Sequence, residues 1–596
     1  MKVKFWEDKW ILSWRKWAIL TVSGVWLCFQ LYWAASGFPG MILVRPVHLS
    51  FAMFLAYLIY PLKLGRGSKT GNKTFRSLEI LLNLIPLILI AISATHYILD
   101  YDRILTRWAT YHPLTILDKI IGVSMIILLL EAGRRVIGAF LSIFAIIFLF
   151  YGIFGPYLPG MLSHHGLSLL HMIDLQAMTD FGMYGVALGV SVTFVYYFVI
   201  LSSYLNATGG DRLLTDISLA TMGRTWGGAA KSAVVASSLV GSISGSAAAN
   251  VVTTGTITIP LMKKGGFSAE VAAAVEASAS TGGQIMPPIM GSSAFLMAYL
   301  LGRPYWEIAI AAIIPAILYY ICLFVIIHIY SVKHNIRPLR VEELPDAKKT
   351  IRQYWHLGIP VVVLVIQIAR LVTLTMAAFR AIILLFGVSF FRKHTRLTLT
   401  RFLKATEAGA RSAAMVAIAC ALAGIVIGVV DYSGLGIKIT GSLVEVCEIH
   451  IALGLLIIIV SVLLLGMGMP TVGAYLSASI LMAPAMVRLG YAPLVSHLFI
   501  LYYAVVSMVT PPVAISSYAA AGIAKAKINK TGVIAFLFCV PGFLIPLLFL
   551  KFPSLVYHDS LLEMSIVLLP FLAVILILIY LAPRFFRLKQ KTTIDV

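Results

Sequence analysis

Long apolar stretches, separated by short polar or basic segments, recur along almost the whole chain. An apolar stretch of about 17 to 25 residues is long enough to cross the hydrocarbon of a bilayer as a helix. The pattern predicts fourteen such spans, near residues 17–36, 44–62, 78–98, 116–132, 136–155, 183–207, 268–300, 306–331, 355–373, 376–391, 411–431, 494–522, 531–549 and 560–582. Two further stretches, 228–262 and 451–487, have small residues at their centres, and we interpret them as re-entrant hairpins.

The composition agrees with an all-α polytopic membrane protein. Of 596 residues, 60% are hydrophobic and 12% are charged, which excludes an ordinary soluble domain. A net charge of +22 could indicate nucleic-acid binding. However, most Lys and Arg residues fall in every second loop between the predicted spans. Such a bias is typical of cytoplasmic loops and predicts that both termini are cytoplasmic. We therefore expect the lipid bilayer, and no nucleic acid, as a partner.

The chain also repeats itself at an ungapped offset of 224 residues. The shift relates Pro287-Pro288 to Pro511-Pro512, Ser292-Ser293 to Ser516-Ser517, and Gly266 to Gly490. We predict two repeats, about 183–300 and 407–524. Their first spans cross the membrane in opposite directions, so the two repeats have inverted orientations in the bilayer. Residues 1–135 hold four spans outside this symmetry and are predicted to form a scaffold module, with a transport module at 136–596.

Matching interruptions in two repeats are typical of a transporter's binding site near the membrane midplane. Proline removes backbone donors and so frees carbonyls there, while glycine lets two backbones approach closely. Carbonyls with Ser, Thr or Asn oxygens can bind a small cation. The cation-binding candidates of the first site are Ser244, Ser246, Asn250, Gly291 and Ser292, and those of the second are Gly468, Met469, Thr471, Thr510, Val513 and Ser516. Met469 and Val513 would contribute only backbone oxygens. The alternative is that these small residues serve close helix packing.

The same breaks also offer groups for an anionic substrate. Helix N-termini with neutral polar side chains bind carboxylate oxygens without a formal cation. The substrate-binding candidates are Asn250, Gln284, Ser293, Thr471 and Ser517. Glu276 lies just before the first break and is a candidate for proton or ion coupling, because a carboxyl group in the membrane is costly without a role. Its alternative role is to pair with a nearby Lys or Arg.

Several other chemistries lack their sequence signatures. There is no phosphate-binding G-x-x-x-x-G-K-[ST] motif and no metal-ligand framework of His and Cys residues. We therefore expect no cofactor and no metal beyond a monovalent cation, with energy drawn from a gradient or from another subunit. A membrane enzyme would need a nucleophile or cofactor site, and the sequence offers none.

At these residues the chain resembles the tripartite ATP-independent periplasmic (TRAP) transporters, in particular the fused permease of the TAXI branch. The resemblance rests on the runs beginning at Gly241 and Val275, on Gly466-Met-Gly-Met-Pro-Thr, and on Thr510-Pro-Pro-Val-Ala. It implies that residues 1–135 correspond to the small membrane subunit and the remainder to the large one. It also implies an elevator-type importer in the bacterial inner membrane, fed by a periplasmic substrate-binding protein.

Taken together, these features predict secondary active uptake of a small organic anion such as a carboxylate. Transport in the family is usually coupled to sodium. Because of Glu276, coupling to protons is a second possibility for this chain. The alternative is a stand-alone carrier of the dicarboxylate/sodium type, which has similar hairpins and needs no binding protein. The four additional N-terminal spans count against that alternative.

Overall fold

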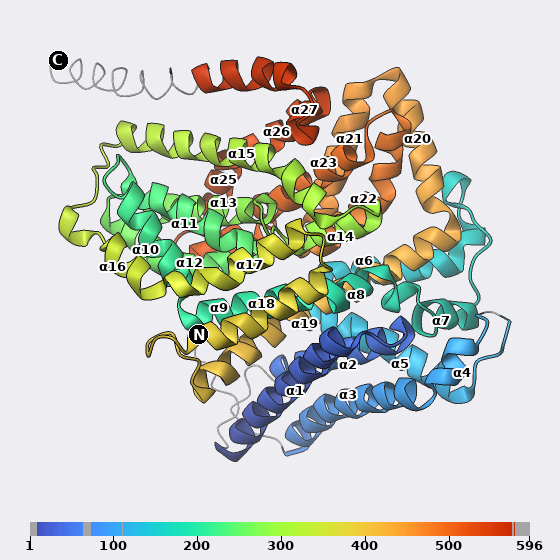
Figure 1. Ribbon diagram of the computed structural model, residues 1–596. Coiled ribbons are helices and arrows are strands. Elements are labelled where there is room, and N and C mark those ends of the chain that lie inside the picture. Colours follow the sequence, from blue (N-terminus) through green and yellow to red (C-terminus); the bar gives the residue numbers. More distant parts are fainter. Residues whose placement is uncertain (1–8, 63–72, 110, 575–576, 578–596) are drawn as a thin grey trace. The chain divides into compact units, whose positions relative to one another are not determined.

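The computed structural model describes residues 9–62, 73–109, 111–574 and Ile577. The described parts of the chain are helical throughout, with no strand among them (Figure 1). An all-helical chain is what the apolar pattern predicts, since a helix satisfies every backbone polar group within its own segment.

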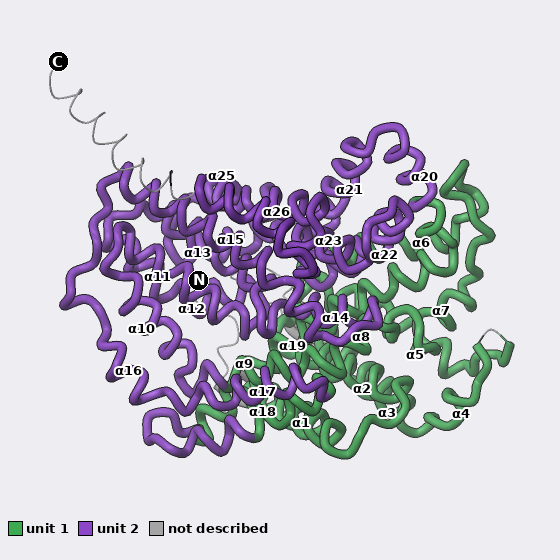
Figure 2. Tube along the Cα trace, turned by 45° about the horizontal axis from the view of Figure 1, so that its top comes forward, with its two compact units in different colours: residues 1–204, 373–383, 397–439 green, residues 205–372, 384–396, 440–596 purple. Residues whose placement is uncertain are grey.

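The chain divides into two compact units, each made of segments distant in sequence (Figure 2). Unit 1 comprises residues 1–204, 373–383 and 397–439, and unit 2 comprises residues 205–372, 384–396 and 440–596. This division does not test the boundary predicted at residue 135, which stays a prediction.

The helices of unit 1 are α1 (Lys9–Ser36), α2 (Met41–Ile59), α3 (Lys73–Leu99), α4 (Tyr101–Thr106), α5 (Ile116–Val136), α6 (Ala139–Phe154), α7 (Leu169–Ala177), α8 (Val186–Val190) and α19 (Leu399–Ser433). Those of unit 2 are α10 (Gly210–Met222), α11 (Gly228–Ser244), α12 (Ala247–Lys264), α13 (Ala269–Gly282), α14 (Ser292–Leu301), α15 (Tyr305–Lys333), α16 (Ala347–Tyr354), α17 (Gly358–Ala369), α21 (Ile451–Gly466), α22 (Thr471–Arg488), α23 (Pro493–Val506), α24 (Ile515–Ala524), α25 (Ile528–Phe538), α26 (Val540–Lys551) and α27 (Ser554–Tyr557). Helices α9 (Tyr196–Thr208), α18 (Leu374–Ser389) and α20 (Leu435–Ile449) contain residues of both units.

Within the described residues, nine helical segments are long and apolar enough to cross a bilayer. Each overlaps one of the fourteen predicted spans, so the chain is a multi-pass membrane protein. The remaining five spans take other forms. Those at 268–300 and 494–522 are each broken into two helices, 376–391 is a 16-residue helix, and 116–132 carries charges at both ends. The predicted span 560–582 extends beyond the described residues.

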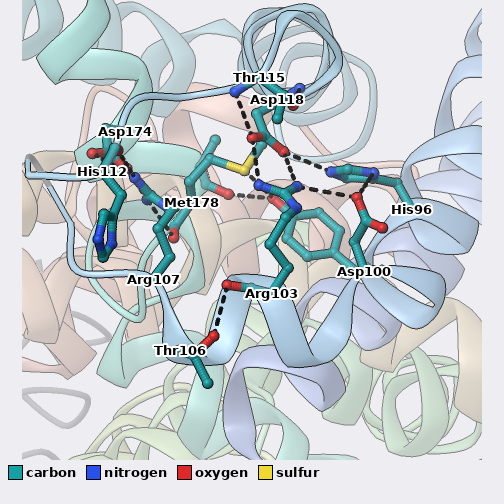
Figure 3. A network of polar contacts seen from close by, with 12 residues as sticks. His96, Asp100, Arg103, Thr106, Arg107, His112, Thr115, Asp118, Asp174 and Met178 are labelled. Carbon is teal, nitrogen blue, oxygen red and sulfur yellow. Dashed lines mark hydrogen bonds and ion pairs between the residues drawn. The ribbon is translucent and has the colours of Figure 1, made fainter.

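A polar network in unit 1 joins the end of α3 to α4, α5 and α7 (Figure 3). Asp118 is 1% exposed, and its carboxylate accepts from Arg103 at 2.7 and 3.0 Å and contacts His96 at 2.8 Å. Thr115 and Asp118 also cap the first turn of α5 reciprocally. Arg107 pairs with Asp174 on α7, and both side chains are buried. These ion pairs fix the segment between α3 and α5 against α7.

In unit 2 the 224-residue offset relates whole elements as well as single residues. Shifting α12 by 224 residues gives the bounds of α22, and shifting α13 gives those of α23. The short 3-10 turns that follow, Gly283–Ile285 and Ser507–Val509, also correspond. Both breaks contain a cis Pro-Pro bond, at Pro287-Pro288 and Pro511-Pro512. The sequence repeat is therefore a structural repeat of a hairpin followed by a broken helix.

In each repeat, the second half of the broken helix packs against helices of the other repeat. Helix α14 of the first repeat packs against α22 and α23 of the second. Conversely, α24 of the second repeat packs against α12 and α13 of the first. Each break therefore lies where helices of both repeats meet.

Candidate functional site

The first hairpin turns within two residues, and its tip lies directly against the first break. Gly245 ends α11 with a φ of +65°, and Ser246 then caps α12 by accepting from the amide of Ala249. A Cβ atom added at Gly245 would lie 2.8 Å from the carbonyl oxygen of Met290 and 3.4 Å from the Cα of Gly291. Glycine is required here both for the left-handed backbone and for the close approach.

A second glycine contact joins the same hairpin to the helix before the break. A Cβ at Gly283 would lie 2.6 Å from the Cα of Gly241, so the two backbones touch. On the far side of the break, the amide of Gly291 donates to the carbonyl of Gln284 at 2.7 Å. The structure thus brings the candidates around Ser244 together with Gly291 and Ser292.

The second tip meets its break at a different point. A Cβ at Gly466 would lie 2.3 Å from the Oγ of Ser507, which is three residues before Thr510. Gly468 has a φ of +80°, and Met469 is fully buried. Val513 is 40% exposed, and the Thr510 hydroxyl donates back to the carbonyl of Val506. The two sites are therefore related by sequence but differ in local geometry.

Many of the candidate side chains carry a buried polar atom that has no hydrogen-bond partner among the described residues. Buried polar groups in folded proteins are almost always paired, so each unpaired one calls for a ligand, an ion or a water. Six such atoms belong to the predicted site residues: Ser244 Oγ, Asn250 Oδ1, Gln284 Nε2, Ser293 Oγ, Ser516 Oγ and Ser517 Oγ. They are divided between the two repeats and gather at the tips and breaks.

The remaining candidates add backbone groups to these side chains. Helices α14 and α24 each begin at a break, and neither has a side-chain cap. Their first amides are therefore free to face a ligand, and helix N-termini favour anions. Thr471, at the start of α22, is buried, whereas Ser246 is exposed and Ser292 is partly buried.

Glu276 is fully buried and is surrounded by hydroxyl groups. Its Oε1 accepts from Ser237 at 2.7 Å, from Ser280 at 3.2 Å and from Thr254, and its Oε2 accepts from Thr258 at 2.5 Å. No Lys, Arg or His of the described chain forms an ion pair with it. Hydroxyl groups are therefore the partners of Glu276 in the structure. The alternative predicted from the sequence was a nearby Lys or Arg.

Sequence reasoning missed these four hydroxyl partners, although part of the signal was present. Thr254 and Thr258 are four residues apart, as are Glu276 and Ser280, so each pair shares a helix face. Ser237 lies on α11, and only the register of the hairpin brings it to the carboxyl group. We call Glu276, Ser237, Thr254, Thr258 and Ser280 the hydroxyl cluster.

The site contains no cluster of metal-binding side chains. Among the residues that the structure describes, no group of three or more His, Cys, Asp or Glu side chains is arranged to hold a metal ion. The polar side chains at the tips and breaks include neutral Ser, Thr, Asn and Gln groups, and the carboxyl group of Glu276 lies on the helix before the first break. They suit a monovalent cation, a proton or an organic anion.

Hairpins that touch broken helices in two related copies, within a multi-pass membrane chain, define a membrane transport protein. The comparison with known families agrees with this class. The family described as "Tripartite ATP-independent periplasmic transporter, DctM component" matches residues 124–555, so the chain belongs to it. It is a family of transporter permeases and not of enzymes.

Several named relatives are similar to the chain. The isethionate TRAP transporter permease DctMQ of Oleidesulfovibrio alaskensis is 25% identical over 56% of this chain and 52% of its own length. The chain thus matches about half of that relative. The C4-dicarboxylate TRAP transporter large permease DctM of Rhodobacter capsulatus is 24% identical over 63% of this chain and 89% of its own length. Among solved structures, the Alcanivorax borkumensis YdaH transporter has a TM-score of 0.44 and 15% identity, covering 73% of this chain and 98% of that one.

Proposed function

We propose that this chain is the membrane permease of a TRAP transporter that takes up a small organic anion by secondary active transport. The observation that carries the proposal is the group of six buried polar atoms without partners at the tips and breaks of unit 2. A polar ligand or ion would satisfy these atoms, which otherwise carry a desolvation cost. A carboxylate substrate is favoured because both breaks end in uncapped helix N-termini.

The coupling ion in this proposal is sodium or a proton. Sodium would bind at the two tip-and-break sites through the carbonyl and hydroxyl oxygens predicted from the sequence. Glu276 is the candidate for a proton. The names of two relatives, which include isethionate and C4-dicarboxylate, support a small anion as the substrate class.

The proposal includes two partners and an arrangement in the membrane. A periplasmic substrate-binding protein would deliver the anion, and residues 1–135 would serve as the small-subunit-like scaffold of a TAXI-type fused permease. The family match starts at residue 124 and leaves the preceding residues outside it, which supports a separate module. We also propose inverted repeats, re-entrant hairpins, elevator movement, and cytoplasmic termini in a bacterial inner membrane.

Uptake into proteoliposomes tests the proposal. Purified chain and its binding protein would be combined with labelled C4-dicarboxylates and isethionate, under an imposed sodium or proton gradient. We expect uptake that requires the binding protein and one of the gradients. Uptake without the binding protein would favour a stand-alone dicarboxylate/sodium-type carrier, and uptake that ignores both gradients would reject secondary coupling.

Removing one hydroxyl from each predicted cation site should weaken ion coupling. Ser292→Ala and Ser516→Ala each remove an oxygen at the start of a helix that follows a break. A hydrogen bond or ligand contact to a charged group is worth about 1.5 to 3 kcal/mol, so the apparent ion affinity should fall about tenfold or more.

The measurement is the dependence of the initial uptake rate on ion concentration, at matched protein amounts. Thr256→Ala is the control, because Thr256 is an exposed hydroxyl residue on α12. Wild-type ion dependence in both serine variants would contradict the placement of the sites.

A further inference from the structure

The hydroxyl cluster contains more short oxygen contacts than it has hydroxyl protons. Besides meeting the carboxyl group, the Thr254 hydroxyl lies 2.8 Å from the carbonyl of Asn250, and the Thr258 hydroxyl lies 3.0 Å from the carbonyl of Thr254. The Ser237 and Thr254 hydroxyls are also 3.0 Å apart. Each hydroxyl has a single proton to donate, so a threonine that donates to its carbonyl cannot also donate to Glu276.

This shortage lets the cluster satisfy Glu276 in either protonation state. When the carboxyl group is ionised, Ser237, Ser280 and the two threonines turn their protons towards it. When it is protonated, its own O–H can donate to the Thr258 hydroxyl, and both threonines then donate to backbone carbonyls. Rotation of hydroxyl groups is enough to change between the two arrangements, since hydroxyl protons turn to suit their partners.

The second repeat shows that packing alone does not require this cluster. At the offset of 224 residues, Glu276 corresponds to Ile500, and Thr254, Thr258 and Ser280 correspond to Ala478, Met482 and Ala504. All four of these apolar residues are buried, and α22 packs against α23 as α12 packs against α13. The fold therefore builds the same helix contact from apolar side chains, and a buried carboxyl group in the first repeat needs a functional reason.

The geometry of the cluster favours a proton over a larger ion. The hydroxyl oxygens lie within hydrogen-bond distance of the carboxyl oxygens, so an ion the size of sodium would have to separate them. A proton enters without moving any heavy atom. The cluster also connects three segments, because Ser237 lies on α11, the threonines lie on α12, and Glu276 and Ser280 lie on α13.

The charged groups of the neighbouring helices are occupied elsewhere or lie at helix ends. The titratable side chain that interacts electrostatically with Glu276 is Tyr320 on α15, whose hydroxyl donates to the carbonyl of Ala279. Lys231 on α11 contacts His328 on α15, and Lys263 on α12 donates to the carbonyl of Ala524. The other charged or titratable residues of the elements packed on α13 are Lys264, Glu270, Tyr305, Glu307, Tyr319, Cys322, Tyr330, Lys333, His497, Tyr502, Tyr503, Tyr518 and Lys530, with Cys539 just after α25.

We propose that Glu276 takes up and releases one proton during the transport cycle, and that this proton site belongs to the first repeat and has no counterpart at the equivalent positions of the second. The proposal rests on the proposed function for its place in a cycle. The site itself does not depend on which anion is carried. Protonation of the cluster would control how the first hairpin is held against the helix that leads to the first break.

Infrared difference spectroscopy of the purified full-length chain tests the proton site without any substrate. A shift in pH should produce a carboxyl C=O band from the protonated side chain, and Glu276→Gln should remove it. Glu307→Gln is the matched control, because Glu307 on α15 is exposed and pairs with Arg303 in the segment just before that helix. A pH-dependent band that is unchanged in Glu276→Gln, or no band in the wild-type chain, would overturn the proposal.

A second variant separates the proton site from folding. The combined substitution Thr254→Ala, Thr258→Met, Glu276→Ile and Ser280→Ala copies the buried set of the second repeat. We expect it to fold, to lack the infrared band, and to lose the stimulation of uptake by a proton gradient. Stimulation equal to that of the wild type would contradict the proposal. Absence of uptake in every variant, including the wild type, would reject the proposed function, while the infrared result would still decide the proton site.

Discussion

Replacement of Gly245 by alanine is expected to reduce uptake about a hundredfold, because the tip of the first hairpin could no longer rest on the first break. The added Cβ atom would lie 2.8 Å from the carbonyl oxygen of Met290, which is part of the backbone and cannot turn aside. The tip and the break must therefore separate. Displacing binding groups by about 1 Å can cost about a hundredfold in rate.

Gly434→Ala is the control for this substitution. Gly434 also has a φ of +65°, but a Cβ atom there would meet nothing within 4 Å. Both variants introduce a similar left-handed strain of about 1 to 2 kcal/mol, and only Gly245→Ala adds the clash. The measurement is the initial rate of uptake at equal amounts of folded protein. Equal rates in the two variants would contradict a functional contact between tip and break.

Asp174→Asn is expected to destabilise unit 1 by about 3 kcal/mol, because it would leave Arg107 buried without its counter-charge. The side chains of Arg107 and Asp174 are 5% and 6% exposed, so water cannot replace the lost partner. The substitution keeps the shape of the side chain and removes only its charge. The measurement is the unfolding of the purified protein in detergent.

Glu307→Gln provides a matched comparison in an exposed ion pair. Arg303 and Glu307 are 41% and 49% exposed, and such pairs contribute less than about 1 kcal/mol. If Asp174→Asn were no more destabilising than Glu307→Gln, the pair shown in Figure 3 would not be holding the segment before α5 in place.

The repeated elements were predictable from the sequence because residues with special backbone properties mark their breaks. Proline fixes φ and removes a backbone donor, so Pro287-Pro288 and Pro511-Pro512 mark the breaks directly. The hairpins predicted at 228–262 and 451–487 agree with the observed pairs α11–α12 and α21–α22 to within about two residues. In contrast, hydropathy alone could not distinguish a broken span from a continuous one, which is why 268–300 and 494–522 were each predicted as a single span although each consists of two helices.

The site was only partly predictable, because side-chain contacts between helices depend on register. The sequence singled out Glu276, and the spacing of Thr254 and Thr258 was visible, but their meeting with Ser237 requires the turn at Gly245. The packing of α14 and α24 against helices of the opposite repeat could not be predicted either, since it joins residues at least 170 positions apart in the sequence. The predicted cation and substrate ligands stay predictions.

Thiol labelling gives the most direct test that the breaks line the path of a transported ligand. In a chain whose five native cysteines are replaced, Ser293→Cys and Ser517→Cys would be treated in vesicles with a membrane-impermeant thiol reagent. Ser278→Cys is the control. Ser278 is equally buried, but its hydroxyl donates to the carbonyl of Ala535 on α25. We predict that both break positions are modified, with loss of uptake, and that position 278 is not. Protection of both break positions, or equal modification at position 278, would contradict the account.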